Sequence, residues 1–340
     1  MKRRRPVIVP VFIPFMGCRT RCVFCRQDRQ TGVAADSASI LADGLVRAWS
    51  QLRWRAQNGL APAELAFYGG TFTAIPGEAL DACLAFARRA TAAGLITSFR
   101  CSTRPDCLDG AILDRLLASG LGAMELGAQS FDERALHFCG RAYSGAEIER
   151  ACAFLRKAGV PFCIQLLPGL PGDRPGLFLD DVGRAIGLGA AMLRFYPCVV
   201  LKGTPLAAIW RAGRYRPWSL QQSVDALARG WLMAESSGVS VIRMGLAPEP
   251  GLEKDVLAGP LAQDLGSRAR GQALVLAVRR MSARVCGTPV RLRLPHACSG
   301  YYLGHAGQLA PQWRELGLEA GAISLASQDC LELLVSIQDF

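Results

Sequence analysis

Short apolar segments alternate with longer amphipathic ones along the first 245 residues of the chain. The segment 7–13 is apolar and rich in β-branched residues, which is typical of a strand buried on both faces. In the segment 40–55, by contrast, apolar residues such as Leu45 and Leu52 recur at the spacing of a helix. This alternation continues through at least six units, and a repeated strand and helix order predicts an α/β fold with a parallel sheet.

The remaining units follow the same pattern. We expect further strands at 64–68, 96–101, 123–127, 161–167, 192–199 and 239–243, and helices at 76–93, 108–118, 144–158, 180–188 and 220–237. Ser144 followed by Glu147 is a capping box, which marks the start of one of these helices. So many consecutive units favour a TIM-like barrel or part of one, with a doubly wound sheet as the alternative.

The segment after residue 252 predicts a second, smaller unit. Its pattern indicates helices at 268–284 and 309–316 and strands at 289–294, 322–326 and 331–337. The sequence Pro248-Glu249-Pro250-Gly251 between the two units is typical of a linker. We therefore predict a core domain over residues 1–247 and a small C-terminal α/β domain over residues 252–340, the latter a candidate for substrate binding.

The residues with unusual chemistry all follow predicted strands. In a barrel enzyme the C-terminal ends of the strands carry the active site. The segments at these ends are Cys18–Cys25, Gly69–Thr73, Ser102–Pro105, Gly127–Ser130 and Gln165–Gly172. Because the ends of parallel strands meet at one edge of a sheet, we expect these segments to form a single site.

Cys18, Cys22 and Cys25 lie in one short loop, separated by three residues and then by two. Thiolates at this spacing suit an iron–sulfur cluster or zinc. Three ligands leave one iron of a four-iron cluster open, where the amine and carboxylate of S-adenosylmethionine (SAM) can chelate, as in radical chemistry based on SAM. The alternatives are structural zinc with a distant fourth ligand, a disulfide with a spare thiol, and chance in a Cys-rich chain. The three histidines are not paired at short spacing, which disfavours a zinc ribbon.

Composition narrows the class of protein. With 340 residues, of which 51% are hydrophobic, the chain is long enough to bury a large core and is not disordered. No apolar run reaches the length of a membrane span, and Pro10 and Pro14 interrupt the run after the basic N-terminus, so we expect no secretory signal. Thirteen cysteines without such a signal predict a reducing compartment, the cytoplasm.

The formal net charge of +11 suits a partner that carries phosphates, such as RNA, although an Arg-rich composition is also expected from a genome biased in base composition. Much of this charge lies in the predicted C-terminal domain, at Arg268, Arg270, Arg279, Arg280, Arg284, Arg291 and Arg293. These side chains either grip RNA phosphates or form a solvated helix face, and the charge pattern does not separate the two.

Taken in order, the motifs resemble those of the radical SAM superfamily. The matching segments are the cysteine loop with Phe24 before its last cysteine, Tyr68–Thr73, Ser102–Asp106, Glu125–Ser130, Pro168–Gly172 and Arg194–Leu206. They span about residues 7–245 and are most similar to the radical-SAM region of Elongator subunit 3, and next to oxygen-independent coproporphyrinogen III oxidase. Unlike Elongator subunit 3, this chain shows no pattern of an acetyltransferase domain after about residue 250.

The resemblance implies a partial (β/α)6 TIM-like barrel in which Cys18, Cys22 and Cys25 ligate a [4Fe-4S] cluster. The SAM contacts that it implies come from Phe24, Gly69, Gly70, Thr71, Ser102, Gln129, Ser130, Arg141 and Gln165. The Gly-Gly-Thr segment would hold the SAM amino group, and the Gln and Arg side chains its ribose or carboxylate. Ser102 stands where both relatives commonly have Glu, and Gln165 stands where the coproporphyrinogen oxidases have Asp.

The expected function is therefore that of a radical SAM enzyme, an oxidoreductase or transferase. Its cofactors would be a [4Fe-4S] cluster and SAM, which is cleaved to a 5′-deoxyadenosyl radical that abstracts hydrogen from a substrate, with tRNA as a candidate. An electron donor such as flavodoxin or ferredoxin is expected as a partner, and a membrane is not. The alternative is a non-catalytic iron–sulfur or zinc protein that carries electrons or binds RNA.

Overall fold

A computed structural model describes residues 6–27, 37–246, 251–285, 287–327 and 330–336 of the chain. Its main feature is one sheet of seven parallel strands in the order β1-β2-β3-β4-β5-β6-β8. These strands are β1 (Ile8–Phe12), β2 (Ala63–Tyr68), β3 (Ile96–Thr103), β4 (Leu121–Gln129), β5 (Phe162–Leu166), β6 (Met192–Phe195) and β8 (Ser240–Met244). Among the described residues β1 and β8 each pair on one side only, so the sheet is an open, partial barrel.

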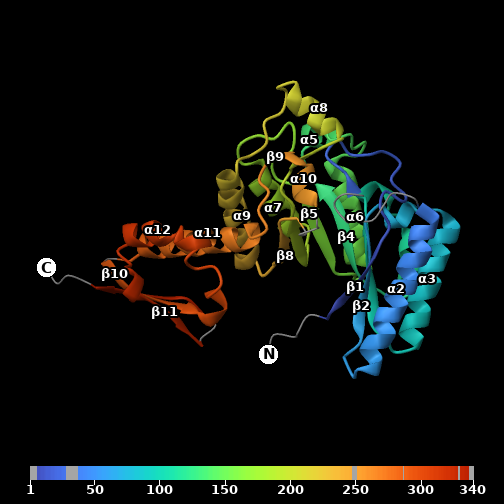
Figure 1. Ribbon diagram of the computed structural model, residues 1–340, viewed down its shortest axis with the longest axis horizontal. Helices are drawn as coiled ribbons and strands as arrows, with labels where there is room; N and C mark the ends of the chain where they lie inside the picture. The colour runs from blue at the N-terminus through green and yellow to red at the C-terminus, as the bar shows by residue number, and fades with distance from the viewer. Residues whose placement is uncertain (1–5, 28–36, 247–250, 286, 328–329, 337–340) are drawn as a thin grey trace.

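The helices of this part of the chain are α2 (Ser37–Gln57), α3 (Gly77–Ala92), α4 (Gly110–Leu117), α5 (Glu133–Phe138), α6 (Gly145–Lys157), α7 (Leu177–Gly187), α8 (Pro205–Arg211) and α9 (Leu220–Ser236). Most of them pack against the sheet, whereas α5 and α8 lie near the C-terminal ends of the strands, at the top of Figure 1. The core between the two layers is large and includes the stacked rings of Phe67 and Phe72, both fully buried, with Phe99 against them. A parallel sheet covered in this way leaves the ends of its strands free to build a site.

A C-terminal lobe, which we define as α11 (Leu265–Ser282) to β12 (Glu332–Ser336), extends to the left in Figure 1. It has a second hydrophobic core, centred on Trp313, which packs against a small sheet with the strand order β11-β10-β12. The other elements are α10 (Leu252–Asp255), β7 (Val200–Leu201), β9 (Val256–Ala258), β10 (Thr288–Pro295), α12 (Ala310–Glu315) and β11 (Ile323–Ala326).

Helix α11 connects the two cores. Leu265 and Ala269, in its first two turns, belong to the core of the main sheet, whereas Val275 and Val278 belong to the core around Trp313. Helix α11, which packs against α9, therefore joins the C-terminal lobe to the core of the main sheet. The predicted linker residues 248–250 lie outside the described residues, and the division at residues 247–252 stays a prediction.

The predicted α/β class and partial barrel are confirmed, and every predicted strand and helix is present with ends that shift by a few residues. The predicted strand 192–199 is too long, because β6 ends at Phe195 and Pro197 follows, which has no N–H for a ladder. The short helices α5 and α8 were not predicted. In the described part of the chain, no helix combines the length and apolarity needed to span a membrane.

Candidate functional site

A cavity of about 510 Å³ lies at the C-terminal ends of the seven strands. Its volume falls in the range of about 300–1,000 Å³ that is usual for small-molecule sites. The cysteine loop after β1, the Gly69–Thr71 turn after β2 and the ends of β3, β4 and β5 all contribute to its wall. The segments that the sequence places after separate strands thus meet in one place.

The cysteine loop has a tightly turned backbone. Phe15 and Gly17 both have positive φ angles, 59° and 75°, and Phe15 is one of few non-glycine residues here in that conformation. The N–H of Cys18 donates to the Phe15 carbonyl (3.0 Å), and the N–H of Cys25 donates to the Cys22 carbonyl (3.0 Å). These turns direct all three cysteines to the cavity wall.

The turn after β2 interlocks with the cysteine loop. Gly70 has φ 59°, and a Cβ atom there would lie 2.1 Å from the Met16 carbonyl oxygen. A Cβ on Gly17 would lie 2.3 Å from the Thr71 carbonyl oxygen, so each loop needs a glycine where the other approaches. The Thr71 N–H donates to the Met16 carbonyl at 2.8 Å. Gly70 is therefore required by the packing of the chain itself, a reason the sequence pattern did not reveal.

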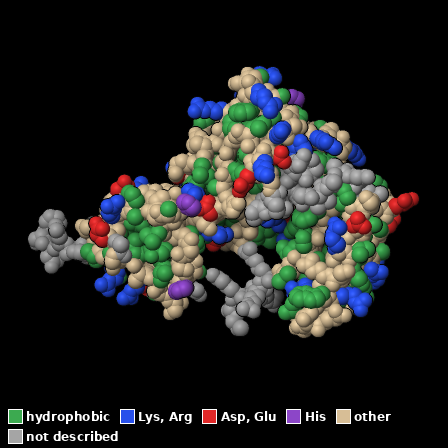
Figure 2. Space-filling view, viewed as in Figure 1, with side chains coloured by type: hydrophobic (Ala, Val, Ile, Leu, Met, Phe, Trp, Pro, Cys, Tyr) green, Lys and Arg blue, Asp and Glu red, His purple; other side chains and the backbone are tan. Residues whose placement is uncertain are grey.

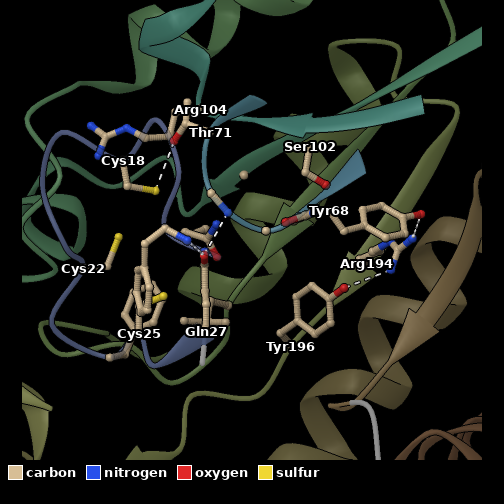
Figure 3. A pocket seen from close by; sticks show the side chains of 18 of the residues that line it. Cys18, Cys22, Cys25, Gln27, Tyr68, Thr71, Ser102, Arg104, Arg194 and Tyr196 are labelled. Carbon is tan, nitrogen blue, oxygen red and sulfur yellow. Dashed lines mark hydrogen bonds between the residues drawn. The ribbon is translucent and has the colours of Figure 1, made fainter. Parts of the chain in front are cut away.

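Gln27 joins these two loops through its side chain. Its Oε1 atom accepts hydrogen bonds from the N–H groups of Phe15 and Gly70, the latter at 2.8 Å. In Figure 3 it lies beside Cys25 and points toward the centre of the cavity. Gln27 was not predicted from the sequence, because its position two residues after the last cysteine carries no signal of a role in the site.

The three thiols lie on one side of the cavity, with Cys18 closest to Thr71 (Figure 3). The Cys18 Sγ and Thr71 Oγ1 atoms are 3.3 Å apart. Burial raises the pKa of Cys18, and burial together with the neighbouring Cys22 and Cys18 raises the pKa of Cys25 to about 12. In the described residues, no three His, Cys, Asp or Glu side chains are grouped closely enough to hold a metal ion as they stand.

Arg141 provides positive charge next to the cysteine loop. Its guanidinium donates from Nη1 to the Gly127 carbonyl and to the Tyr143 hydroxyl, and its Nε is buried without a hydrogen-bond partner among the described residues. Its charge is close enough to Cys22 and Cys25 to interact with both. A buried cation with an unused donor beside three thiols suits a negatively charged group bound in the cavity.

A buried ionic network lies behind the opposite side of the cavity. Glu125 on β4 is fully buried and receives hydrogen bonds from Tyr68 (3.0 Å), Gln165 (3.0 Å) and the Nη2 atom of Arg194 (2.8 Å). Arg100 bridges Glu125 (3.2 Å) and the buried Glu64 (2.6 Å). The network holds Tyr68, Gln165 and Arg194 in position at the cavity wall.

Arg194 also donates from Nη1 to the Tyr196 hydroxyl at 3.0 Å. Figure 3 shows Tyr68 and Tyr196 on either side of the Arg194 side chain. Burial raises the pKa of Tyr196, which keeps the phenol protonated. These residues lie in the sequence motifs described above, but their mutual contacts were not predicted. Ion pairs between strands depend on the register in which neighbouring strands pair, which the sequence does not give.

Eight of the nine predicted cofactor-binding residues line the cavity. They are Phe24, Gly69, Gly70, Thr71, Ser102, Gln129, Arg141 and Gln165. Gln129 has φ 71°, an uncommon conformation for a non-glycine residue, at the point where β4 enters the cavity wall. Ser130 is not brought to the cavity: its hydroxyl donates to Asp181 of α7 at 2.7 Å, and it is buried on that side.

Comparison with known families agrees with this geometry. The family model described as "Radical SAM superfamily" matches residues 12–180, and "Radical_SAM C-terminal domain" matches residues 190–270. The chain belongs to the radical SAM superfamily. The first match covers the cysteine loop and β2 to β5, and the second covers β6, β8 and the start of α11.

Relatives of this radical SAM protein cover it only in part. It is 26% identical over 129 residues to the tRNA uridine(34) acetyltransferase of Methanocaldococcus jannaschii, which is 37% of this chain and 24% of that protein. Protein YhcC of Escherichia coli is 33% identical over 116 residues, 33% of this chain and 38% of that protein. The chain thus spans about a quarter to two fifths of the length of these relatives.

Among solved structures, the archaeal Elp3 of Methanocaldococcus infernus, with its N-terminus deleted, superposes with a TM-score of 0.61. The superposition covers 81% of this chain and 65% of the Elp3 chain at 19% identity. At that identity the similarity shows a shared fold.

The residues of this radical SAM protein fit the cofactors that its family uses. Three thiols on one loop are soft ligands for iron, and the open space beside them continues into the rest of the cavity. The unused buried donor of Arg141 and the cavity-lining backbone of Gly69 and Gly70 offer partners for a carboxylate and an amine. Metal binding requires thiolates, so it would remove the protons that burial favours on Cys18 and Cys25.

Proposed function

We propose that this chain is an enzyme that binds a [4Fe-4S] cluster through Cys18, Cys22 and Cys25 and cleaves SAM reductively. The observation that carries the proposal is that the three cysteines and eight predicted SAM contacts, from five different strand ends, line one cavity. A protein that only carries electrons needs no cavity of this size next to its cluster. Membership of the radical SAM superfamily supports the same assignment.

When bound, the cluster and SAM together supply a 5′-deoxyadenosyl radical, which abstracts a hydrogen atom from the substrate. The residues of the chain position the reactants. The Gly69 and Gly70 backbone would bind the SAM amino group, Arg141 its carboxylate, and Gln129 its ribose. Phe24 would provide an apolar wall, and Ser102 and Gln165 the polar ones. The sheet behind the cavity excludes water from the reacting atoms.

We propose a tRNA as the substrate to test first. Support comes from the tRNA uridine(34) acetyltransferases among the relatives and from the net charge of +11. The arginines of the C-terminal lobe are a weaker argument, because Arg268 pairs with Asp264 (2.8 Å), Arg279 with Glu315 (3.2 Å) and Arg293 with Glu332 (3.6 Å). On the face shown in Figure 2, basic side chains are dispersed over both lobes.

The test is an anaerobic assay of the reconstituted, reduced protein with SAM, in which 5′-deoxyadenosine is measured. We expect 5′-deoxyadenosine from the wild type and from Cys152→Ala, which removes a buried thiol on α6 away from the cavity. Cys22→Ala should form none. If the wild type also forms none with several reductants, or if the purified protein holds zinc in place of iron, the proposal is wrong.

The substrate is tested separately by fluorescence anisotropy of a labelled tRNA at a salt concentration of about 0.15 M, where exposed charges are largely screened beyond the Debye length. Binding that survives at this ionic strength supports tRNA. Binding that occurs only at low salt, or not at all, rejects it.

A further inference from the structure

The cavity wall carries positive charge and, among its described residues, no carboxylate. Five arginines line it, namely Arg21, Arg104, Arg141, Arg194 and Arg243, and no Asp or Glu is among the described lining residues. Their charges are not equally available to a ligand, because some already have partners.

Four of the five lie near opposite charge or near the cysteines. Arg194 pairs with Glu125, and Arg104 forms two hydrogen bonds of 2.9 Å with Asp106. Arg141 interacts with Cys22 and Cys25, and Arg21 lies over the ring of Phe15 at the start of the cysteine loop. A bound cluster with three thiolates would add negative charge beside the latter two.

Arg243 is different. It lies on β8, the last strand of the sheet, in register with Arg194 of β6. No acidic residue in the described part of the chain forms an ion pair with it, and it is half-buried at the cavity wall. Its charge interacts with Tyr196. The Tyr196 hydroxyl accepts a hydrogen bond from Arg194, so its own proton remains available to donate toward the cavity.

The wall across the open edge of the barrel is apolar. Ile8, Pro10 and Phe12 of β1 line the cavity there, together with Leu246 at the end of β8. Figure 3 shows Arg194 and Tyr196 on the side of the cavity away from Cys18 and Cys22. This end of the cavity therefore combines one unpaired cation and one free hydroxyl donor with an apolar surface.

We propose that Arg243 and Tyr196 form a subsite for an oxyanion, a phosphate or a carboxylate, on a substrate whose adjoining part is apolar or aromatic. The proposal rests on the proposed function in that this oxyanion belongs to the substrate and not to SAM. Arg243 would bind the anion as an ion pair, Tyr196 would donate a hydrogen bond to it, and Ile8, Pro10 and Phe12 would cover the apolar part. Arg194, neutralised by Glu125, orients Tyr196 and does not bind the anion.

The test measures binding to the cluster-loaded protein by ligand-observed NMR titration, with phenyl phosphate, benzoate and the neutral phenol as probes. We expect the two anions to bind more tightly than phenol. Arg243→Gln should weaken the binding of both anions at least tenfold, since a charge-assisted hydrogen bond contributes this much to affinity. Arg243→Lys should restore part of the loss. Arg229→Gln, which removes an exposed arginine on α9, is the matched control and should change nothing.

A short RNA oligonucleotide distinguishes the sources of a phosphate. If Arg243→Gln weakens binding of the oligonucleotide as much as binding of phenyl phosphate, the anion belongs to a polynucleotide. If the substitution weakens binding of the small probes only, the anion belongs to a small molecule. The proposal is overturned if the anions bind no more tightly than phenol, or if Arg243→Gln leaves the difference in affinity intact. It is also overturned if Arg243→Gln weakens the binding of SAM by the same factor as the binding of the anions. Because binding is measured without turnover, failure of SAM cleavage would count against the proposed function and not against this subsite.

Discussion

Replacement of Glu125 by Gln should cost more stability than any change at the surface. The Glu125 side chain is fully buried and is the only acid paired with Arg194 among the described residues, at 2.8 Å, while Arg100 keeps a second partner in Glu64. Glu125→Gln is nearly isosteric but leaves Arg194 buried and facing an amide. Breaking one side of a buried ion pair costs about 3–5 kcal/mol.

Urea denaturation of the reduced protein at neutral pH measures this loss. Glu149→Gln is the control, because its ion pair with Arg184 is about half exposed, with 47% of each side chain accessible. Exposed pairs contribute about 0–1 kcal/mol. We therefore expect Glu125→Gln to lower the free energy of unfolding by several kcal/mol more than Glu149→Gln does.

A double-mutant cycle extends the measurement and remains informative if Glu125→Gln folds poorly. Arg194→Met removes the cation that the first change leaves unpaired, so the double variant should be more stable than the sum of the two single changes implies, by more than about 1 kcal/mol. If Glu125→Gln and Glu149→Gln lower the unfolding free energy equally, or if the cycle shows no coupling, the network does not stabilise the fold in the way described.

The remaining predictions concern the cysteine loop and one buried acid. In Gly70→Ala, the new Cβ or the Met16 carbonyl has to move by about 0.9 Å to reach the 3.0 Å separation that real Cβ atoms keep, so the iron bound per protein after reconstitution should fall well below that of the wild type. Gly77→Ala is the control, because Gly77 has open space around it and the variant should bind iron normally. Equal iron content in the two variants would contradict the interlock of the two loops. Burial raises the pKa of Asp181 to about 6 although Ser130 and Phe131 donate hydrogen bonds to it, so the carboxyl holds its proton more tightly in the folded chain. Its contribution to the unfolding free energy should therefore fall by about 2 kcal/mol as the pH rises from 4 to 7. Asp181→Asn should remove that slope, and an unchanged slope in urea titrations across this range would show that Asp181 is not its source.

Much of the fold is readable in the sequence because burial sets the pattern. The mostly apolar segments of β2, β4 and β5 reflect strands covered on both faces, and the Ser144 and Glu147 capping box marks the observed start of α6. Helices α5 and α8 span only six and seven residues and lack a full amphipathic repeat, so periodicity does not detect them.

The site was predictable to the level of which segments meet, and less so for individual side chains. Topology alone brings strand ends together, which accounts for Thr71 and Gln129, whereas Arg141 lies in the loop after α5 and was expected from the family resemblance. It does not say which way a polar side chain turns: Ser130 bonds to Asp181 on the helix side. Gln27 and Arg243 became visible only in three dimensions, because Gln27 bonds to the Gly70 N–H and the charge of Arg243 acts on Tyr196, both partners being distant in sequence.

The interlock of the cysteine loop with the turn after β2 has a consequence for biosynthesis. The loop ends at residue 27, but the groups that hold its shape, the Gly70 N–H on Gln27 and the Thr71 N–H on Met16, are made more than forty residues later in translation. A nascent chain that has released only its first strand and helix from the ribosome has all three thiols and none of these supports. Iron and sulfide supplied at that moment would meet a flexible peptide, so productive loading of the site has to wait until β2 has emerged and paired with β1.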